Sequence, residues 1–339
     1  MPENVMEQIV AELKDSGEQY FPDRSELRSV RIVGHTPKSD HYIYDVVVDF
    51  ADGSERVTAK VYRNTKSGPN GPRGTAKLEA SNLEHVYTIF QKRKLAGVPR
   101  PIGDFSEWGA VVAEKFTGLP LQSIIMKAAL LPGYADRGML TLAARKTGEW
   151  LRSFHRATSD MPSPFDGAAV LKDLEKLCEN CKGEGLDDAA IRTILSGTRA
   201  LLARTRQTLP TSAVLNDFTP LNVVVGDQGI GICDYAKMSL RGTSFNDVAM
   251  FLASVEALEK YPFCNRNMTG QVQDEFLSAY GADRSEQAVL RVLKMKALLS
   301  MFAQGRNVKE SALRKRVMWA TVMKRFIQQA AQRSMSPAA

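Results

Sequence analysis

The stretch that decides the fold is "LNDFTPLNVVVGDQGIGICDY", residues 215–235. Its apolar runs "NVVV" and "IGIC" flank "GDQG", a turn cluster with glycine at both ends, and this pattern predicts a short β-hairpin. Residues at equal distances from a hairpin turn face each other. The hairpin therefore brings Asn222 and Asp234 to the same open end. Asp217 lies just before that end, in a segment that Pro220 keeps out of regular structure.

An amide and two carboxylates gathered in this way have the chemistry of a phosphoryl-transfer site. Mg²⁺ takes one or two protein oxygen ligands and completes its octahedron with phosphate oxygens and water. A further carboxylate that is free of the metal can orient or deprotonate an attacking hydroxyl. Together these groups are the equipment of phosphoryl transfer.

The spacing D-x-x-x-x-N, followed by a hairpin and a second Asp, resembles the catalytic and metal-binding segments of the protein-kinase fold. "NDFTPLNVVV", "IGICDYAKM" and "GTSFNDVAMFL" are similar to the aminoglycoside phosphotransferase and choline-kinase-like branch of that superfamily. The resemblance implies that Asp217 is the catalytic base and that Asn222 and Asp234 bind the metal. It also implies that Asp247 is a buried structural carboxylate and that ATP and Mg²⁺ are the cofactors.

The N-terminal third of the chain carries the strand signals. Residues 29–34, 41–50 and 55–63 read as three strands, and Asp-Gly in the turn "ADGS" indicates a hairpin between the second and the third. The Gly/Pro-rich stretch 64–75 reads as a flexible connection. Apolar residues at helical spacing then predict a helix within 76–94.

After about residue 120 the pattern is mostly helical, with strand signals only around Val214 and in the opening stretch. We therefore expect an α+β fold, and the resemblance implies a two-lobed protein-kinase-like one. Residues 1–116 would form a small nucleotide-binding lobe of three or more antiparallel strands plus one helix. Residues 117–339 would form a large helical lobe with the catalytic loop, the metal site, the acceptor site and basic C-terminal helices.

The upstream strands supply a candidate phosphate-binding lysine. Lys60 lies in "VTAKVY", which resembles the V-A-I-K strand whose lysine reaches the α- and β-phosphates. The family requires a helical glutamate to hold this lysine. Glu79 shares a helix face with Leu83, whereas Glu84 fits the family's spacing to the next strand better, so both remain candidates and Glu79 is preferred.

Two further segments match the family less closely. "VVAEKFTGLPL" resembles the segment that binds adenine through its main chain, which makes Glu114, Lys115 and Phe116 the candidate hinge. The first hairpin contains only Gly34 and no G-x-G-x-x-G, which leaves main-chain contacts to the phosphates in doubt.

The catalytic segment also departs from the family at one position. Leu215 stands where a histidine that supports the catalytic loop is expected, two residues before Asp217. His155, in "LRSFHRA", matches a helix-borne histidine of such proteins and is interpreted as structural packing.

The acceptor is expected to be a small molecule that carries a hydroxyl group. Only twelve residues separate Asp234 from Asp247, which is too few for the activation segment of a protein kinase. From Arg284 to the C-terminus, the sequence contains twelve Lys and Arg residues but only two acidic residues. A pocket there would repel polycations, so a sugar or a glycolipid or lipopolysaccharide-type acceptor is favoured over an aminoglycoside. The alternative is a pseudokinase or nucleotide-binding scaffold that acts through this basic region.

The remaining features favour a cytoplasmic protein. The N-terminus has no signal-peptide pattern, and no apolar run approaches a membrane span. The basic helix over 313–330 would pack on the core, or else contact an anionic inner-membrane surface. Nucleic-acid binding is not expected, because no motif for it is present. Cys178 and Cys181 form an isolated C-x-x-C and are interpreted as reduced thiols.

Overall fold

The computed structural model describes residues 2–64, 71–131, 137–182, 186–205, 208–261, 263–283, 286–305, 322 and 324–335. The chain forms two compact units. The first unit comprises Met1–Leu119 and Val224–Met238, and the second comprises Pro120–Val223 and Ser239–Ala339. The hairpin segment Val224–Met238 thus belongs to the first unit, although the sequence pattern placed it with residues 117–339.

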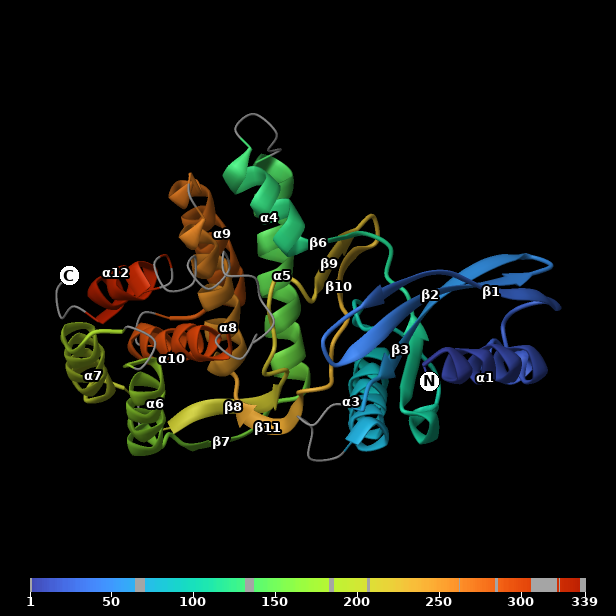
Figure 1. Cartoon of the computed structure of the whole chain (residues 1–339), viewed down its shortest axis with the longest axis horizontal. Helices are drawn as coiled ribbons and strands as arrows, with labels where there is room; N and C mark the ends of the chain where they lie inside the picture. The colour runs from blue at the N-terminus through green and yellow to red at the C-terminus, as the bar shows by residue number, and fades with distance from the viewer. Residues whose placement is uncertain are drawn as a thin grey trace. The chain divides into compact units, whose positions relative to one another are not determined.

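The first unit is built on a five-stranded antiparallel sheet (Figure 1). Its strands, in spatial order, are β1 (Leu27–Pro37), β2 (His41–Phe50), β3 (Gly53–Tyr62), β5 (Ala110–Glu114) and β4 (Pro101–Gly103). The β2–β3 register is continuous from His41 opposite Tyr62 to Phe50 opposite Gly53. This register confirms the predicted turn at "ADGS".

The two faces of this sheet have different coverings. Helix α1 (Pro2–Asp15) supplies Met6, Ile9 and Leu13 to a core that includes Val46 and Ala59. Since side chains alternate along a strand, the opposite face carries Lys60 and its neighbours at every second position. Helix α3 (Gly71–Arg93) lies on the Lys60 side, where its Glu79 contacts the lysine.

A second, small sheet contains the predicted hairpin, with the order β10 (Gly229–Ile232), β9 (Val223–Gly226) and β6 (Leu119–Pro120). The hairpin packs closely on the segment that leaves the first sheet. At Gly118, whose φ is +158°, an added Cβ would lie 2.3 Å from the carbonyl oxygen of Val225. The amide of Ile232 donates a hydrogen bond to the carbonyl of Gly97, 3.0 Å away.

The second unit is mainly helical. Its helices are α4 (Leu121–Leu130), α5 (Arg137–Ala157), α6 (Gly167–Lys182), α7 (Asp188–Leu202), α8 (Phe245–Glu256), α9 (Arg266–Tyr280), α10 (Gln287–Gly305) and α12 (Lys324–Met335). A three-stranded sheet of β11 (Ser239–Thr243), β8 (Thr208–Val214) and β7 (Asp160–Pro164) leads into the segment that contains Asp217.

Three local predictions differ from the structure. Helix α3 begins at Gly71, so part of the predicted connection 64–75 is helical, and residues 65–70 lie outside the described part of the chain. Strands β7 and β11 were not predicted, because both are short and pair only through β8. The first unit also contains helix α1 in addition to α3, whereas a single helix was expected.

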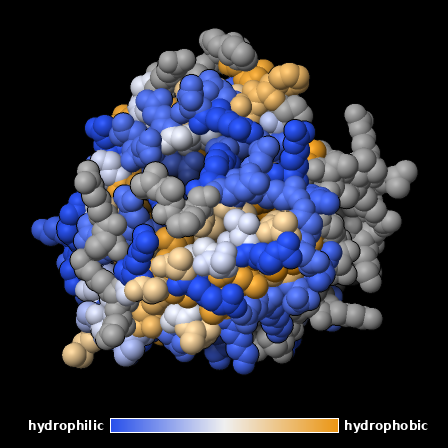
Figure 2. Space-filling view, turned by 90° about the vertical axis from the view of Figure 1, so that its left-hand side faces the viewer, coloured by the Kyte–Doolittle hydropathy of each residue, from blue (hydrophilic) through white to orange (hydrophobic). Residues whose placement is uncertain are grey.

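The described part of the basic C-terminal segment packs in the core of the second unit. Phe326, Ile327 and Ala330 of α12 are buried with residues of α10. Figure 2, which views the chain from the side of α12, shows mostly hydrophilic residues around a smaller apolar area. This packing favours the core alternative for α12, whereas residues 313–321 lie outside the described part. None of the described helices is long and apolar enough to cross a bilayer. Cys178 and Cys181 are buried in the same core as free thiols.

Candidate active site

Lys60 is the centre of a buried ion cluster in the first unit. Its Nζ lies 3.0 Å from Oε1 of Glu79 on α3 and 3.2 Å from Oδ1 of Asp234, just after the hairpin. The Lys60 and Glu79 side chains are 11% and 4% exposed, whereas that of Asp234 is 24% exposed. Of the two candidate partners, Glu79 makes the contact with the lysine, and Glu84 is exposed on α3.

The cluster keeps Lys60 and Asp234 charged. Burial alone would lower the pKa of Lys60, but Glu79 and Asp234 outweigh it and raise that pKa well above its usual value. Burial would likewise raise the pKa of Asp234. The ammonium of Lys60 and the amide of Ala236 reverse this effect and hold the pKa of Asp234 below its usual value. The cluster thus holds a fixed cation beside a fixed, partly exposed carboxylate.

Helix α3 also holds the segment that carries Asp234. The Nδ2 of Asn82 donates to the carbonyl oxygens of Tyr235 and Met238, at 3.0 and 3.2 Å. The amide of Tyr235 donates to Glu79 Oε1 at 3.3 Å. Glu79 and Asn82 lie three positions apart and share a helix face. The helix that holds Lys60 therefore positions the Asp234 segment as well.

Two residues of this cluster were missed by the sequence interpretation. Tyr62 donates a short hydrogen bond from its hydroxyl to Glu79 Oε2, and its ring lies 5.2 Å from Lys60 Nζ. His41 is the cross-strand partner of Tyr62, and the two ring centroids lie 5.7 Å apart. The pKa of His41 is lowered, chiefly because the ring is buried and also because the positive charge of Lys60 disfavours the imidazolium. Tyr62 could have been found by its spacing of two from Lys60, which places both side chains on one face.

The candidate hinge follows β5 directly. The amides of Glu114 and Lys115 donate to the carbonyls of Arg100 and Arg56, at 2.8 and 2.9 Å. These two amides therefore form hydrogen bonds within the first unit. The ring of Phe116 lies against Gly231 of β10, where an added Cβ would come within 2.3 Å of it. The segment is thus clamped between the first sheet and the hairpin.

In the second unit, the loop after β8 carries Asp217 and Asn222. Asn222 Nδ2 donates to the carbonyl oxygen of Asp217 at 2.9 Å. This hydrogen bond closes the loop on itself and leaves the side-chain oxygen of Asn222 for another partner. Both side chains are half-buried.

Asp247 anchors the start of this loop from within the core. It is completely buried in the first turn of α8, and its two carboxylate oxygens accept hydrogen bonds from the amides of Leu215 and Asn216, each at 2.8 Å. Asn216 has a φ of 60°, a left-handed conformation that asparagine tolerates better than most residues. His155 Nε2 lies 3.1 Å from Asp247 Oδ2, and its Nδ1 lies 3.0 Å from the Tyr280 hydroxyl. Asp247, contacted by His155, therefore anchors the loop although position 215 carries leucine and not the histidine that the family resemblance led us to expect.

Several solved structures resemble the chain along nearly its whole length. An amicoumacin kinase in complex with AMP-PNP, Ca²⁺ and Ami has a TM-score of 0.55 at 12% identity and covers 96% of both chains. A spectinomycin phosphotransferase in complex with ADP and spectinomycin has the same TM-score and identity and covers 96% of this chain and 98% of its own. A choline kinase from Streptococcus pneumoniae has a TM-score of 0.50 at 14% identity over 94% and 99%. No family model and no curated protein sequence matches the chain.

The chain has the protein-kinase-like fold. This finding confirms the predicted α+β class and the predicted kinase-like fold. At these levels of identity the likeness establishes the fold, and the roles of individual residues depend on their geometry in this chain.

The predicted site residues of this kinase-like chain fall into two groups. Lys60, Glu79 and Asp234 meet in the first unit, and the hinge candidates belong to the same unit. Asp217 and Asn222 meet in the second unit. Each group is held by a buried carboxylate, Glu79 in the first and Asp247 in the second.

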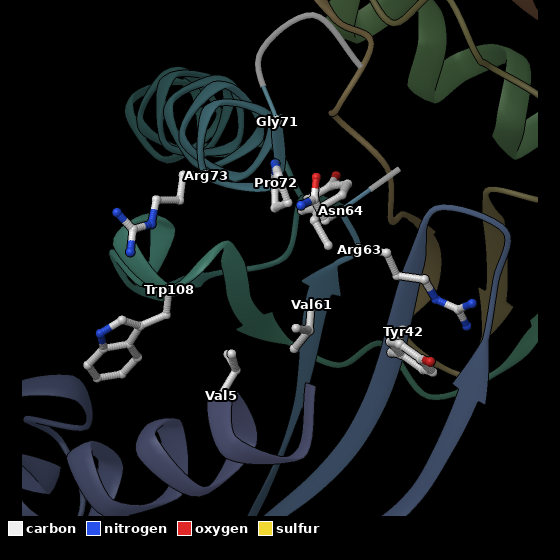
Figure 3. A pocket seen from close by; sticks show the side chains of 10 residues that line it. Val5, Tyr42, Val61, Arg63, Asn64, Gly71, Pro72, Arg73 and Trp108 are labelled. Carbon is white, nitrogen blue, oxygen red and sulfur yellow. The ribbon is translucent and has the colours of Figure 1, made fainter. Parts of the chain in front are cut away.

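A hollow of about 600 Å³ lies at the end of the first sheet, mainly on the face opposite Lys60 (Figure 3). Val5 of α1, Trp108 and the start of α3 at Pro72 line it. Tyr42 and Val61, which also line it, alternate with His41 and Lys60 along β2 and β3 and therefore face the other side of the sheet. Tyr62, whose hydroxyl contacts Glu79, lines the hollow as well, so the hollow borders the Lys60 cluster but does not include Lys60, Glu79 or Asp234.

Proposed function

We propose that the chain is an ATP- and Mg²⁺-dependent kinase that transfers the γ-phosphate to a hydroxyl of a small molecule. The observation that carries this proposal is the buried Lys60–Glu79–Asp234 cluster on a protein-kinase-like fold. A structural ion cluster would need no partly exposed carboxylate. Here Asp234 is both charged and accessible, as a cation ligand must be.

In this proposal the first unit binds the nucleotide. Lys60, held by Glu79, contacts phosphate oxygens of ATP as a fixed positive charge. Glu114, Lys115 and Phe116 lie beside the adenine ring of ATP, and the main chain of this segment contacts the ring. Since the amides of Glu114 and Lys115 are already bonded within the sheet, the carbonyl groups and the amide of Phe116 are the candidates for base recognition.

Asp234 and Asn222 fit a magnesium ion by their donor chemistry. Both offer oxygen atoms, and the hydrogen bond from Asn222 Nδ2 to the Asp217 carbonyl turns the amide so that its oxygen is available. When bound, Mg²⁺ would neutralise the negative charge on the phosphates. Asn222 directly precedes β9 and Asp234 follows β10, so the hairpin connects the two proposed ligands along the chain.

Asp217 acts on the acceptor in this proposal. Its carboxylate accepts a hydrogen bond from the acceptor hydroxyl, orients it and takes its proton as the oxygen attacks the phosphorus. The anchoring of Leu215 and Asn216 by Asp247 limits the motion of the loop that carries this carboxylate. Such positioning accounts for much of the catalysis in phosphoryl transfer.

For the acceptor we propose a sugar or a glycolipid-type molecule, and an aminoglycoside less readily. The basis is the excess of positive charge after Arg284. Part of that excess is neutralised within the second unit, because Lys294 and Arg333 pair with Glu256 and Lys296 pairs with Asp173. The structures that share the fold are described with acceptors as different as choline and spectinomycin, so the fold alone does not choose among them.

The nucleotide and metal part of this proposal is tested by Asp234→Asn. Calorimetric titration with ATP should show that Mg²⁺ strengthens binding to the wild type at least tenfold. In the variant this enhancement should fall below about threefold, because a charged metal ligand has become a neutral one. Asp227→Asn, in the exposed hairpin turn, is the matched control and should behave as the wild type. A wild type that binds no nucleotide, or an undiminished Mg²⁺ effect in Asp234→Asn, would contradict the assignment.

A further inference from the structure

We propose that His41 is a phosphate-binding residue that contacts the nucleotide through its Nε2. In this role it replaces the main-chain contacts that a glycine-rich loop provides in other kinase-like proteins. This inference rests on the proposed function, because it names a further residue of the same nucleotide site.

The strand register places His41 on the same face of the sheet as Lys60. His41 pairs with Tyr62 and Ile43 pairs with Lys60, and directly paired residues project to the same side. The imidazole is therefore one side-chain pair beyond Lys60, toward the β1–β2 turn. Its side chain is only 13% exposed, so it is held at the cluster and does not extend freely into solvent.

The surroundings of His41 leave one ring nitrogen for a ligand. Nδ1 lies 2.9 Å from Oδ1 of Asp40. Among the described residues, no group forms a hydrogen bond with Nε2. The ring centroid lies 5.7 Å from that of Tyr62, whose hydroxyl donates to Glu79, so the imidazole borders the Lys60 cluster.

The chemistry of the ring suits a phosphate oxygen. An imidazolium carries N–H groups on both nitrogens, so Asp40 can accept from Nδ1 while a phosphate oxygen accepts from Nε2. Lys60 opposes this charged form in the protein alone, and the negative charge of a triphosphate counteracts that effect. The bound nucleotide would thus favour the form of the ring that binds it.

The β1–β2 hairpin offers little else for this task. It contains a single glycine, Gly34, which pairs with Asp45 inside the sheet and therefore lies away from the turn. The turn itself is closed by a hydrogen bond from the amide of Lys38 to the carbonyl of His41. The amide of Lys38 is thus already bonded within the turn, and His41 supplies a donor side chain at the base of the turn, on the face that carries Lys60.

The test compares the binding of ATP, ADP and adenosine to His41→Ala and to the wild type by calorimetry. We expect the Kd for ATP to rise about 10- to 100-fold, as for loss of a charge-assisted hydrogen bond, with a smaller rise for ADP. Adenosine has no phosphate, so its Kd should change by less than about twofold. His41→Gln keeps an N–H donor and should recover part of the loss. His35→Ala, an exposed histidine of the same hairpin, is the control and should bind all three ligands normally.

Each outcome separates the inference from the proposed function. Unchanged ATP affinity in His41→Ala would overturn the inference and leave the kinase assignment standing. Equal losses for ATP and adenosine would also overturn it, because His41 would then support only the fold of the site. A wild-type protein that binds none of the three ligands would overturn the proposed function and the inference with it.

Discussion

Asp217→Asn is expected to lower kcat for phosphoryl transfer by about 10³-fold or more while the Kd for ATP changes by less than about threefold. The asparagine keeps the size of the side chain and its loop, but it cannot take a proton from the acceptor hydroxyl. A positioned general base contributes about 10²- to 10⁴-fold to such reactions. The nucleotide contacts of the proposed site are made by Lys60 and the hinge, so binding should survive.

The measurement is steady-state transfer to an acceptor that the wild type phosphorylates, together with ATP binding on the same preparation. Asp227→Asn carries the same chemical change in an exposed turn and should retain wild-type kcat. If Asp217→Asn turned over as fast as the wild type, Asp217 would not be the base. If it lost ATP binding and kcat together, its role would lie in the nucleotide site.

Asp247→Ala is expected to lower the free energy of unfolding by about 3–5 kcal/mol, the range for breaking a buried charged network. Asp247 is fully buried and accepts from the amides of Leu215 and Asn216. Its removal leaves both amides without their acceptor and takes away the carboxylate that His155 contacts. The loop that begins at Leu215 would then lose its anchor, so transfer should fall as well.

Urea unfolding at neutral pH measures this loss, with the slope of the transition compared between the proteins. Asp274→Ala, at an exposed position of α9, is the control and should cost less than about 0.5 kcal/mol. Asp247→Asn retains one acceptor oxygen and should lie between the wild type and the alanine variant. A stability of Asp247→Ala equal to that of the control would show that the buried carboxylate does not hold the loop.

The sequence was most informative where periodicity and turn chemistry agreed. The strands around Lys60 alternate cleanly, and an Asp-Gly turn separates two of them, so their pairing could be predicted. The helical spacing of Glu79 and Leu83 indicated which glutamate faces inward, and Glu79 is the one that contacts Lys60. The hairpin before Asp234 was readable for the same reason, since two apolar runs flank a glycine-bounded turn.

The parts that were missed depend on pairing between distant segments. His41 joins the cluster only through the β2–β3 register, and nothing in its local sequence marks it as different from His35. Strands β7 and β11 are polar and short and exist because both pair with β8. The start of α3 was hidden because glycine and proline usually indicate a loop, although proline is well suited to the first turn of a helix, where Pro72 lies.

The central claim is that this kinase-like chain transfers a phosphoryl group and is not only a nucleotide-binding scaffold. The most direct measurement is ³¹P NMR of the wild-type protein with ATP, Mg²⁺ and a pool of sugars, amino sugars, lipid-linked sugars and aminoglycosides. A new phosphomonoester resonance should grow as ADP forms, and it should be absent without Mg²⁺. If the protein binds ATP but no phosphomonoester forms from any member of the pool, including lipid-linked sugars and aminoglycosides, the scaffold alternative is correct and the proposed kinase activity is contradicted.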